Sequence, residues 1–396
     1  MTRWLRRNLF RGPVDAVVSA TGVALALYVL YRAVRFVAVT GRWDVVRLNL
    51  KLLLVGRYPD THLPRVAVSL VVGTGVAALV AGIVHRRQRD AGTFALAGAG
   101  TGRRMVDVFE RLWPVLLGAG LLLGLSGSPG PWVTAAGVAG AAVTGRLLGV
   151  AVPRKLHAPL VAGAIATPFL LIWYLADGSA WDSWGGLMLN VFMAVAAILM
   201  CFPLGVFAAL GRQSQLPLIS ATSTAYIELF RGAPLFVLLL MANVALGFFV
   251  PAGTAPGRVV RAIVVFSLFT GAYVAEIVRG GLQSLPQGQT EAGRALGLSA
   301  TRITFLIVLP QALRNVIPAQ VGQFISLFKD TTLAGAAMGL FELLQVGQAV
   351  TRQGPFAGQG LLPESLAFVG LLFWLGSYTM SRESQRIEAK LGVGTR

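Results

Sequence analysis

Long apolar windows, separated by short polar and mostly basic connections, recur along the whole chain. A window of about 20 apolar residues is long enough to cross about 30 Å of hydrocarbon as a helix. The pattern therefore predicts an all-α polytopic membrane protein with about ten transmembrane helices. A membrane β-barrel would show ~10-residue segments of alternating polarity instead. The ten expected spans are Asp15–Tyr31, Val66–Val84, Trp113–Leu125, Trp132–Val150, Pro159–Ala176, Leu187–Leu210, Ala233–Val250, Val259–Val278, Ile317–Leu340 and Leu361–Thr379.

Composition supports a bilayer protein over a soluble one. Of 396 residues, 55% are hydrophobic and only 13% are charged, whereas soluble domains carry about 25% charged residues. The net charge of +18 is spread over short loops and forms no single basic face, which argues against nucleic-acid binding. The single cysteine, Cys201, excludes an internal disulfide.

The distribution of basic residues predicts that both termini are cytoplasmic, because cytoplasmic loops carry an excess of Lys and Arg. Arginines cluster before the first span, after the second span and in the tail. We interpret the first apolar run as a retained span because it lacks a clear signal-peptide cleavage site. One loop fits this topology poorly. Residues Thr40–Pro64 fall outside by this count, yet the loop contains Arg42, Arg47, Lys51 and Arg57.

Small residues at helical spacing, as in "GVALALY", "GTGVAALVAG" and "GVAGAAVTG", predict close helix packing in the membrane. The composition changes near residue 180, after which polar residues occur at specific places inside apolar runs. We therefore expect an accessory bundle of about five spans over residues 1–180 and a working core over residues 181–396.

Residues 286–310 form a polar segment between two spans. Glu291, Arg294 and Leu298 recur at three or four residues, as on one face of a helix. Gly297 offers a turn, and Ser299 is suited to cap a second helix that begins at Ala300. The segment is too polar and too short to drive membrane folding. It predicts two short helices on the cytoplasmic side that dock to a soluble partner.

Glu291 is followed by Ala292 and Gly293, by a glycine six residues after the glutamate, and by Ile307-x-Leu309-Pro310. This pattern resembles the "EAA" loop of ABC-importer permeases. "AYIELFRGAPLFVLLLM" and "LPQALRNVIPAQVGQFISLFKDTTLAG" resemble the polar and general L-amino-acid branch of that family, in its extended form. The resemblance implies a five-helix type I importer core. It also implies that the loop couples to a cytoplasmic ATPase through Glu291, Ala292, Gly293, Arg294, Gly297, Leu309 and Pro310.

The same resemblance implies a set of partners in a bacterial inner membrane. These are an ABC ATPase dimer, a second and related permease subunit, an extracytoplasmic amino-acid-binding protein and a polar L-amino acid as cargo. The chain itself would be non-catalytic, with ATP hydrolysed by another chain. An ion-gradient-driven secondary transporter is the alternative, although no convincing inverted repeat is visible. A membrane scaffold is a second alternative, but it would not explain the docking segment.

Ionisable residues at membrane depth are functional candidates. Glu276 and Arg279 lie three residues apart, and Glu228 and Arg231 repeat the spacing. Each pair is interpreted either as a local ion pair or as a group that supports the coupling loop or contacts the ATPase. All four residues are also candidates for the translocation pathway. Lys329 and Asp330 are adjacent and do not face each other on a helix. They are candidates to line a pathway for a zwitterion or to pair with neighbouring helices. Asn190 is a candidate for the pathway or for helix–helix hydrogen bonding.

Several kinds of chemistry lack a motif. None of the four lysines follows a glycine, so the chain has no Gly-Lys-Ser/Thr phosphate-binding loop. The three histidines have no ligand spacing, and no Gly-x-Ser-x-Gly nucleophile element occurs. We expect no metal and no cofactor.

Overall fold

The computed structural model describes residues 12–90, 120, 122–125, 129–179, 181–249, 251 and 254–391. In these residues the fold is helical, and extended pairing is limited to two isolated bridges. The all-α prediction is confirmed. Among the described residues, six continuous helical segments are long and apolar enough to span a membrane. They contain α2 (Pro13–Arg35), α5 (Leu63–Asp90), α7 (Pro129–Ala151), α8 (His157–Ala176), α9 (Gly186–Arg212) and α13 (Arg258–Gln283).

Three further expected spans have helical counterparts among the described residues. The helices α10 (Pro217–Gly232) and α11 (Leu235–Val244) form a pair bent by 100°. The helices α16 (Leu309–Asp330) and α19 (Leu362–Leu391) have 22 and 30 residues, or about 33 and 45 Å at 1.5 Å per residue. The remaining expected span, Trp113–Leu125, lies largely outside the described residues.

Short elements connect these helices. They are η1 (Phe36–Thr40), α3 (Asp44–Leu48), α4 (Leu50–Val55), η2 (Asp60–His62), η3 (Arg154–Leu156), η4 (Trp181–Ser183), α12 (Leu246–Phe249), α14 (Gly288–Ala295), α15 (Ala300–Ile303), η5 (Thr304–Val308), α17 (Leu333–Met338) and α18 (Leu343–Val350).

Two expected spans differ from the structure. The prediction of one continuous helix over Ala233–Val250 is wrong, because α11 has only ten residues, or about 15 Å. Pro234 disfavours helical geometry in the residue before it, and Ala233 is extended with φ −96° and ψ 140°. The prediction of one continuous helix over Ile317–Leu340 is also wrong. Here α16 ends at Asp330, and Gly339 turns the chain with φ +67° after α17.

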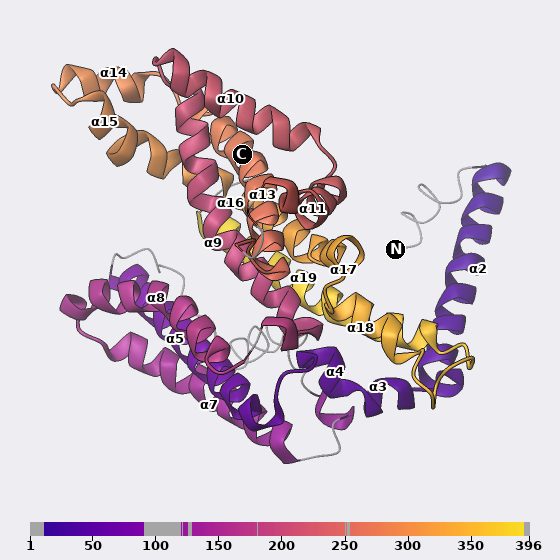
Figure 1. Ribbon diagram of the computed structural model, residues 1–396. Helices are drawn as coiled ribbons and strands as arrows, with labels where there is room; N and C mark the ends of the chain where they lie inside the picture. The colour runs from indigo at the N-terminus through magenta and orange to yellow at the C-terminus, as the bar shows by residue number, and fades with distance from the viewer. Residues whose placement is uncertain are drawn as a thin grey trace.

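The amino-terminal helices α5, α7 and α8 pack together beside the core (Figure 1). The α5–α7 contact confirms the role predicted for two of the small-residue stripes. A Cβ added at Gly145 or Gly149 would collide with a carbonyl oxygen of Gly75 or Leu79 in α5. Helix α2 differs, because it has no buried residue and Gly22 meets nothing within 4 Å. Its stripe makes no close contact within the described chain.

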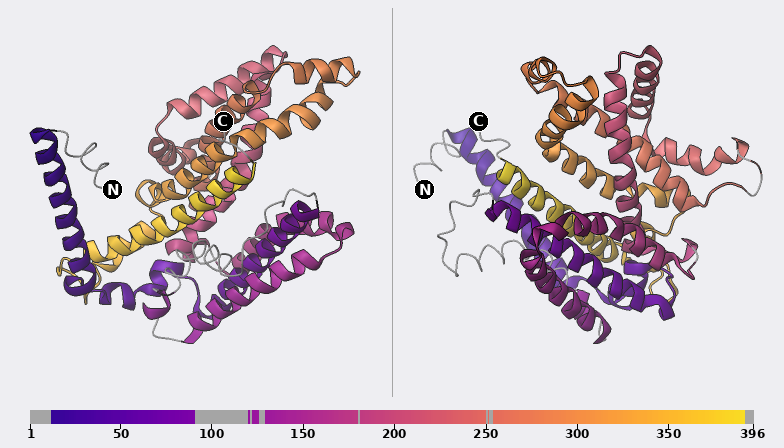
Figure 2. Two further views of the ribbon diagram at one scale, coloured as in Figure 1. Left: turned by 180° about the vertical axis from the view of Figure 1, so that it is seen from behind. Right: turned by 90° about the vertical axis from the view of Figure 1, so that its left-hand side faces the viewer.

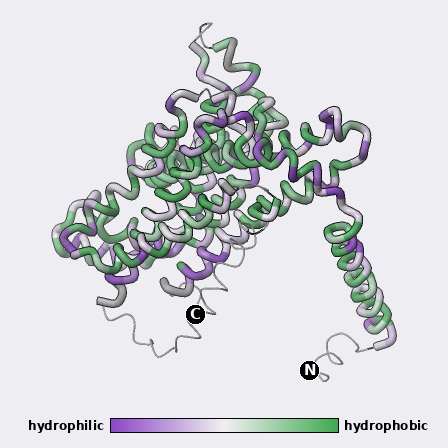
Figure 3. The backbone as a smooth tube through the Cα atoms, turned by 90° about the horizontal axis from the view of Figure 1, so that it is seen from below, coloured by the Kyte–Doolittle hydropathy of each residue, from purple (hydrophilic) through white to green (hydrophobic). Residues whose placement is uncertain are grey.

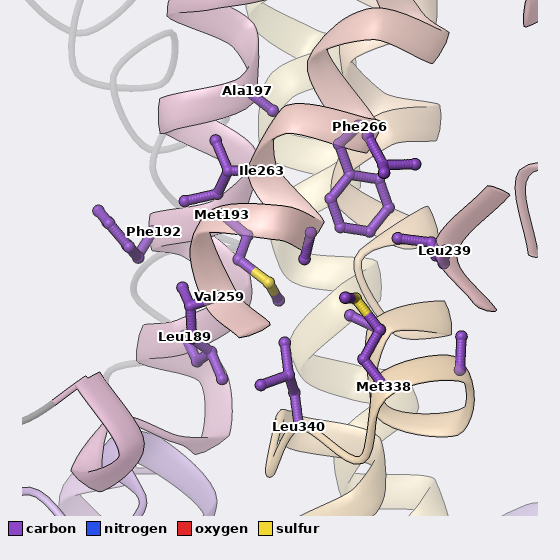
Figure 4. Packing of buried hydrophobic residues seen from close by; sticks show 14 of the residues in the cluster. Leu189, Phe192, Met193, Ala197, Leu239, Val259, Ile263, Phe266, Met338 and Leu340 are labelled. Atoms are coloured by element: carbon purple, nitrogen blue, oxygen red, sulfur yellow. The ribbon is translucent and has the colours of Figure 1, made fainter. Parts of the chain in front are cut away.

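The core is built around α9 and α13. Its largest buried cluster joins Leu189 and Met193 of α9, Phe266 of α13, Leu239 of α11 and Met338 of α17 (Figure 4). Along the chain, hydrophobic residues dominate the long helices and hydrophilic residues gather at ends and connections (Figure 3).

The two ends of α9 define two opposite sides of the molecule. Gly186, at its start, lies against α4, whereas Gly211, near its end, borders a cleft beside α14 and α15. Helices α3 and α4 therefore lie at the end of the protein opposite α14 and α15 (Figures 1 and 2).

Candidate coupling loop and pathway residues

The expected docking segment forms two short helices that project beyond the end of α13. Helix α14 ends in a glycine turn in which Gly297 has φ +74°. The Gly297 amide donates to the Arg294 carbonyl at 2.9 Å, and the Leu298 amide donates to the Gly293 carbonyl at 3.1 Å. These two bonds constitute a Schellman motif, which requires a left-handed residue where Gly297 lies. The predicted turn at Gly297 is confirmed.

The second helix begins as the sequence predicts. Ser299 is the N-cap of α15, and its hydroxyl accepts a hydrogen bond from the Arg302 amide at 3.4 Å. A serine in this position satisfies an amide that has no partner within the helix. The chain then passes through the π-helical turn η5 into α16 without a break.

The two short helices are held together at Gly293, which is buried in α14. A Cβ at Gly293 would lie 2.8 Å from Cγ1 of Ile303, whose side chain is 2% exposed. The absence of a side chain at position 293 therefore lets α15 approach α14 closely.

The remaining expected coupling residues fall into two groups. Glu291, Ala292 and Arg294 are exposed. Leu309 is buried in a cluster with residues of α9 and α13, and Pro310 lies in the first turn of α16. The first group is available to a partner, and Leu309 anchors the loop to the core.

Sequence reasoning missed Leu296, which is 79% exposed at the end of α14. An apolar side chain at the tip of a polar loop is well placed to contact another protein. The sequence feature that could have identified Leu296 is its position directly before the turn glycine.

A cleft of about 920 Å³ separates the coupling loop from the adjoining helix ends. Its walls come from the end of α9 (Leu210, Gly211), the α9–α10 turn (Gln213, Ser214) and the loop itself (Thr290, Arg294, Thr301). The loop therefore contacts the core mainly through its two roots and projects away from it at its tip.

Glu276 lies at the centre of a charged cluster behind the loop. Its carboxylate accepts hydrogen bonds from Arg279 of the same helix at 2.9 Å and from Arg212 of α9 at 2.7 Å. Arg231 of α10 approaches it at 3.6 Å. The expected local pair between Glu276 and Arg279 is confirmed, and the cluster also joins three helices.

The second expected local pair does not form. Glu228 binds Arg212 at 3.0 Å, while Arg231 turns to Glu276 and lies 5.6 Å from the centre of the Tyr273 ring. Three guanidinium groups thus surround two carboxylates, which leaves the cluster with one excess positive charge.

Lys329 and Asp330 lie at the end of α16 away from the coupling loop. Lys329 is exposed and Asp330 is half-buried. Within the described part of the chain, neither side chain has a hydrogen bond or an ion pair, and the two do not bridge each other. The expectation that they do not pair directly is confirmed for these residues.

Asn190 lies beside this position, in α9, with its side chain fully buried. Its amide nitrogen donates to the Thr331 hydroxyl at 2.9 Å and to the Glu342 carboxylate at 3.2 Å. Its amide oxygen accepts from the Leu343 amide at 2.8 Å. These contacts are those of helix–helix hydrogen bonding, one of the two roles expected for Asn190.

Glu342 is a second residue that sequence reasoning missed. It caps α18 by accepting the amides of Leu344 and Gln345, each at 2.8 Å, and is itself completely buried. Burial raises the pKa of the Glu342 carboxyl above its usual value, although those two amides act in the opposite direction. The sequence feature that could have identified Glu342 is a lone glutamate directly before an apolar helix.

The geometry defines a helical membrane protein with a capped polar loop that projects from its core. A family model described as "Binding-protein-dependent transport system inner membrane component" matches residues 201–382. The glutamate/glutamine/aspartate/asparagine transport system permease protein BztC of Rhodobacter capsulatus is 33% identical, over 98% of this chain and 93% of that protein. The chain belongs to this family and is a multi-pass inner-membrane permease subunit of an ATP-driven importer.

Two further comparisons cover about half to three-fifths of the chain. The inner membrane amino-acid ABC transporter permease protein YhdY of Escherichia coli is 40% identical, over 59% of this chain and 65% of that protein. A solved amino acid ABC transporter with histidines is 25% identical over 51% of this chain and 90% of its own, with a TM-score of 0.45. Family membership favours an ATP-driven importer over an ion-gradient-driven transporter.

Proposed function

We propose that this chain forms part of the translocation pathway of an importer for polar L-amino acids. The observation that carries this proposal is the coupling loop, with its capped α14–α15 hairpin and the exposed Leu296. The names of the relatives, which include glutamate, glutamine, aspartate and asparagine, support the substrate class.

The loop docks to a cytoplasmic ATPase dimer, which hydrolyses the ATP. Leu296 enters a groove on that partner, and Glu291 and Arg294 contact its rim. The charged cluster around Glu276 ties α9, α10 and α13 together next to the loop. Movement of the loop would thereby reach three helices at once.

Cargo passes between this subunit and a second, related permease subunit after delivery by an extracytoplasmic binding protein. An amino-acid zwitterion needs groups of both signs. Lys329 and Asp330 supply them at adjacent positions, and neither side chain has a hydrogen bond or an ion pair in the described chain. The loop lies in the cytoplasm, both termini are cytoplasmic, and residues 1–180 form an accessory unit beside the core.

Co-purification with the ATPase tests the proposal. The variant Gly297→Val places a β-branched residue where φ is +74°, a geometry that such residues avoid, and should lose the ATPase while remaining in the membrane. Gly297→Asn, which tolerates this geometry, should retain it. Gly354→Val is the matched control, because Gly354 is exposed with nothing within 4 Å. ATP-independent uptake driven by an ion gradient, with no ATPase bound to the wild type, would contradict the proposal.

A further inference from the structure

The connection between α2 and α5 carries an unexpected excess of basic residues. Residues 41–60 contain Arg42, Arg47, Lys51 and Arg57 but only two acids, Asp44 and Asp60. The connection lies at the end of α9 opposite the coupling loop. With that loop in the cytoplasm, these charges face the outside, where positive residues are normally scarce.

The connection is firmly packed against the core. Helix α3 contacts α19, and α4 contacts α9 and α18. Val45, Val46 and Leu53 are completely buried in a cluster with Leu343 of α18. The backbones also touch, because a Cβ at Gly56 would collide with Gly185. The connection is therefore an ordered part of the core surface.

The opposite face of the same two helices is exposed and basic. Arg47 in α3 and Lys51 in α4 are both exposed. Lys51 pairs with Asp60 at 2.6 Å. The guanidinium groups of Arg42 and Arg47 have no acidic partner within the described chain. Their charge is thus available to another molecule.

The segment also contacts the turn that leads to the pathway candidates. The Arg57 guanidinium lies 4.7 Å from the centre of the Phe341 ring. Phe341 precedes Glu342, which is bonded to Asn190, and Asn190 in turn bonds to Thr331. Thr331 follows Asp330 directly. The basic surface is therefore connected by direct contacts to the end of α16.

We propose that Arg42, Arg47, Lys51 and Arg57 form a docking surface for an acidic rim of the extracytoplasmic binding protein. This inference rests on the proposed function, which supplies the orientation. The matched family is described as binding-protein-dependent, so a protein must dock on this side. Contact of Arg57 with the α17–α18 turn places the surface over the core, which favours a docked protein over anionic lipid at the membrane rim.

The test uses the amino-acid-binding protein that stimulates the ATPase of the wild-type importer. Its affinity for the importer is measured with the importer in phosphatidylcholine nanodiscs. The variant carries Arg42→Glu and Arg47→Glu, because neither side chain has an acidic partner to lose. We expect the Kd to rise by about tenfold and the salt dependence of binding to weaken. The control, Arg154→Glu with Lys155→Glu, makes the same change of net charge between α7 and α8 and should bind like the wild type.

Unchanged affinity of the variant would overturn the docking surface while leaving the importer assignment intact. If the double variant binds with an unchanged Kd but its ATPase activity no longer responds to added phosphatidylglycerol, the basic surface binds lipid and the docking proposal is overturned. A wild type whose ATPase activity responds to no binding protein would instead refute the proposed function, so the two failures are distinguishable.

Discussion

Arg212, the last residue of α9, donates a 2.7 Å hydrogen bond to Glu276 in α13 and also bridges to Glu228 in α10. One guanidinium thus connects three helices directly behind the coupling loop. The Glu276 side chain is only 16% exposed and faces three arginines. It is the residue on which the cluster depends.

Replacing Glu276 by glutamine should therefore destabilise the protein. Removing one partner of a buried ion pair costs about 3–5 kcal/mol. Since the arginine side chains here are about a third exposed, we expect about 2 kcal/mol, seen as a lowered Tm of the purified protein. Asp60→Asn removes an exposed pair with Lys51 and should cost less than about 1 kcal/mol. Equal Tm values for the two variants would contradict this role of Glu276.

A side chain at Gly293 should separate α14 from α15. Gly293→Val would press on Ile303, which a Cβ alone already approaches to 2.8 Å. We expect ATPase affinity to fall by about tenfold, or about 1.4 kcal/mol, measured by titration of the purified ATPase. Gly288→Val is the matched control in the same helix, because nothing lies within 4 Å of Gly288. The added substitution Ile303→Ala should restore part of the affinity. No rescue would indicate that the loss arises elsewhere.

Neutralising the charges at the end of α16 should impair transport and leave the coupling loop intact. For Lys329→Met and for Asp330→Asn we expect uptake of polar amino acids to fall by about tenfold, because a zwitterion loses one charged contact worth about 1.5 kcal/mol. ATPase co-purification should be unchanged. Lys155→Met removes an exposed lysine from the amino-terminal unit and should transport normally. Normal uptake by both pathway variants would exclude the proposed role of Lys329 and Asp330.

Replacing Asn190 should lower the stability of the protein and leave substrate affinity unchanged, unlike the changes at Lys329 and Asp330. Asn190→Ala would leave the buried Leu343 amide without its partner and deprive Glu342 of a donor. We expect a loss of about 2 kcal/mol in stability and a lowered Tm, with the KM for uptake unchanged in the protein that remains folded. Asn243→Ala, which removes one 3.2 Å bond to the Ala337 carbonyl, should cost about 1 kcal/mol. A changed KM with normal stability would instead place Asn190 in the pathway.

Sequence predicted the features that depend on neighbouring residues. The Gly297 turn and the Ser299 cap are set by a few adjacent positions, and both were predictable. The spans were predicted from apolar composition alone, which does not register a break such as Pro234. The α10–α11 bend was missed because α10, which contains Glu228 and Arg231 shortly before Pro234, is too polar to be predicted from apolar composition.

Contacts between distant residues were not predictable. The spacing of Glu276 and Arg279 indicated their pair, but nothing local indicates that Arg212 and Arg231 also reach Glu276. In the same way, α3 and α4 are too short to give a clear periodic signal. Their buried face is defined only by the α9, α18 and α19 residues against which they pack.

Cysteine cross-linking tests the central claim, that the α14–α15 loop contacts an ATPase. In a Cys201→Ala background, Leu296→Cys places a thiol at a site that is 79% exposed. Leu48→Cys is the matched control at the opposite end of the molecule, at a site that is 74% exposed. With a bifunctional reagent, we predict that Cys at position 296, and not at position 48, cross-links to the ATPase subunit. An ATPase adduct at position 48, or at neither position in an assembled and active importer, would contradict the account.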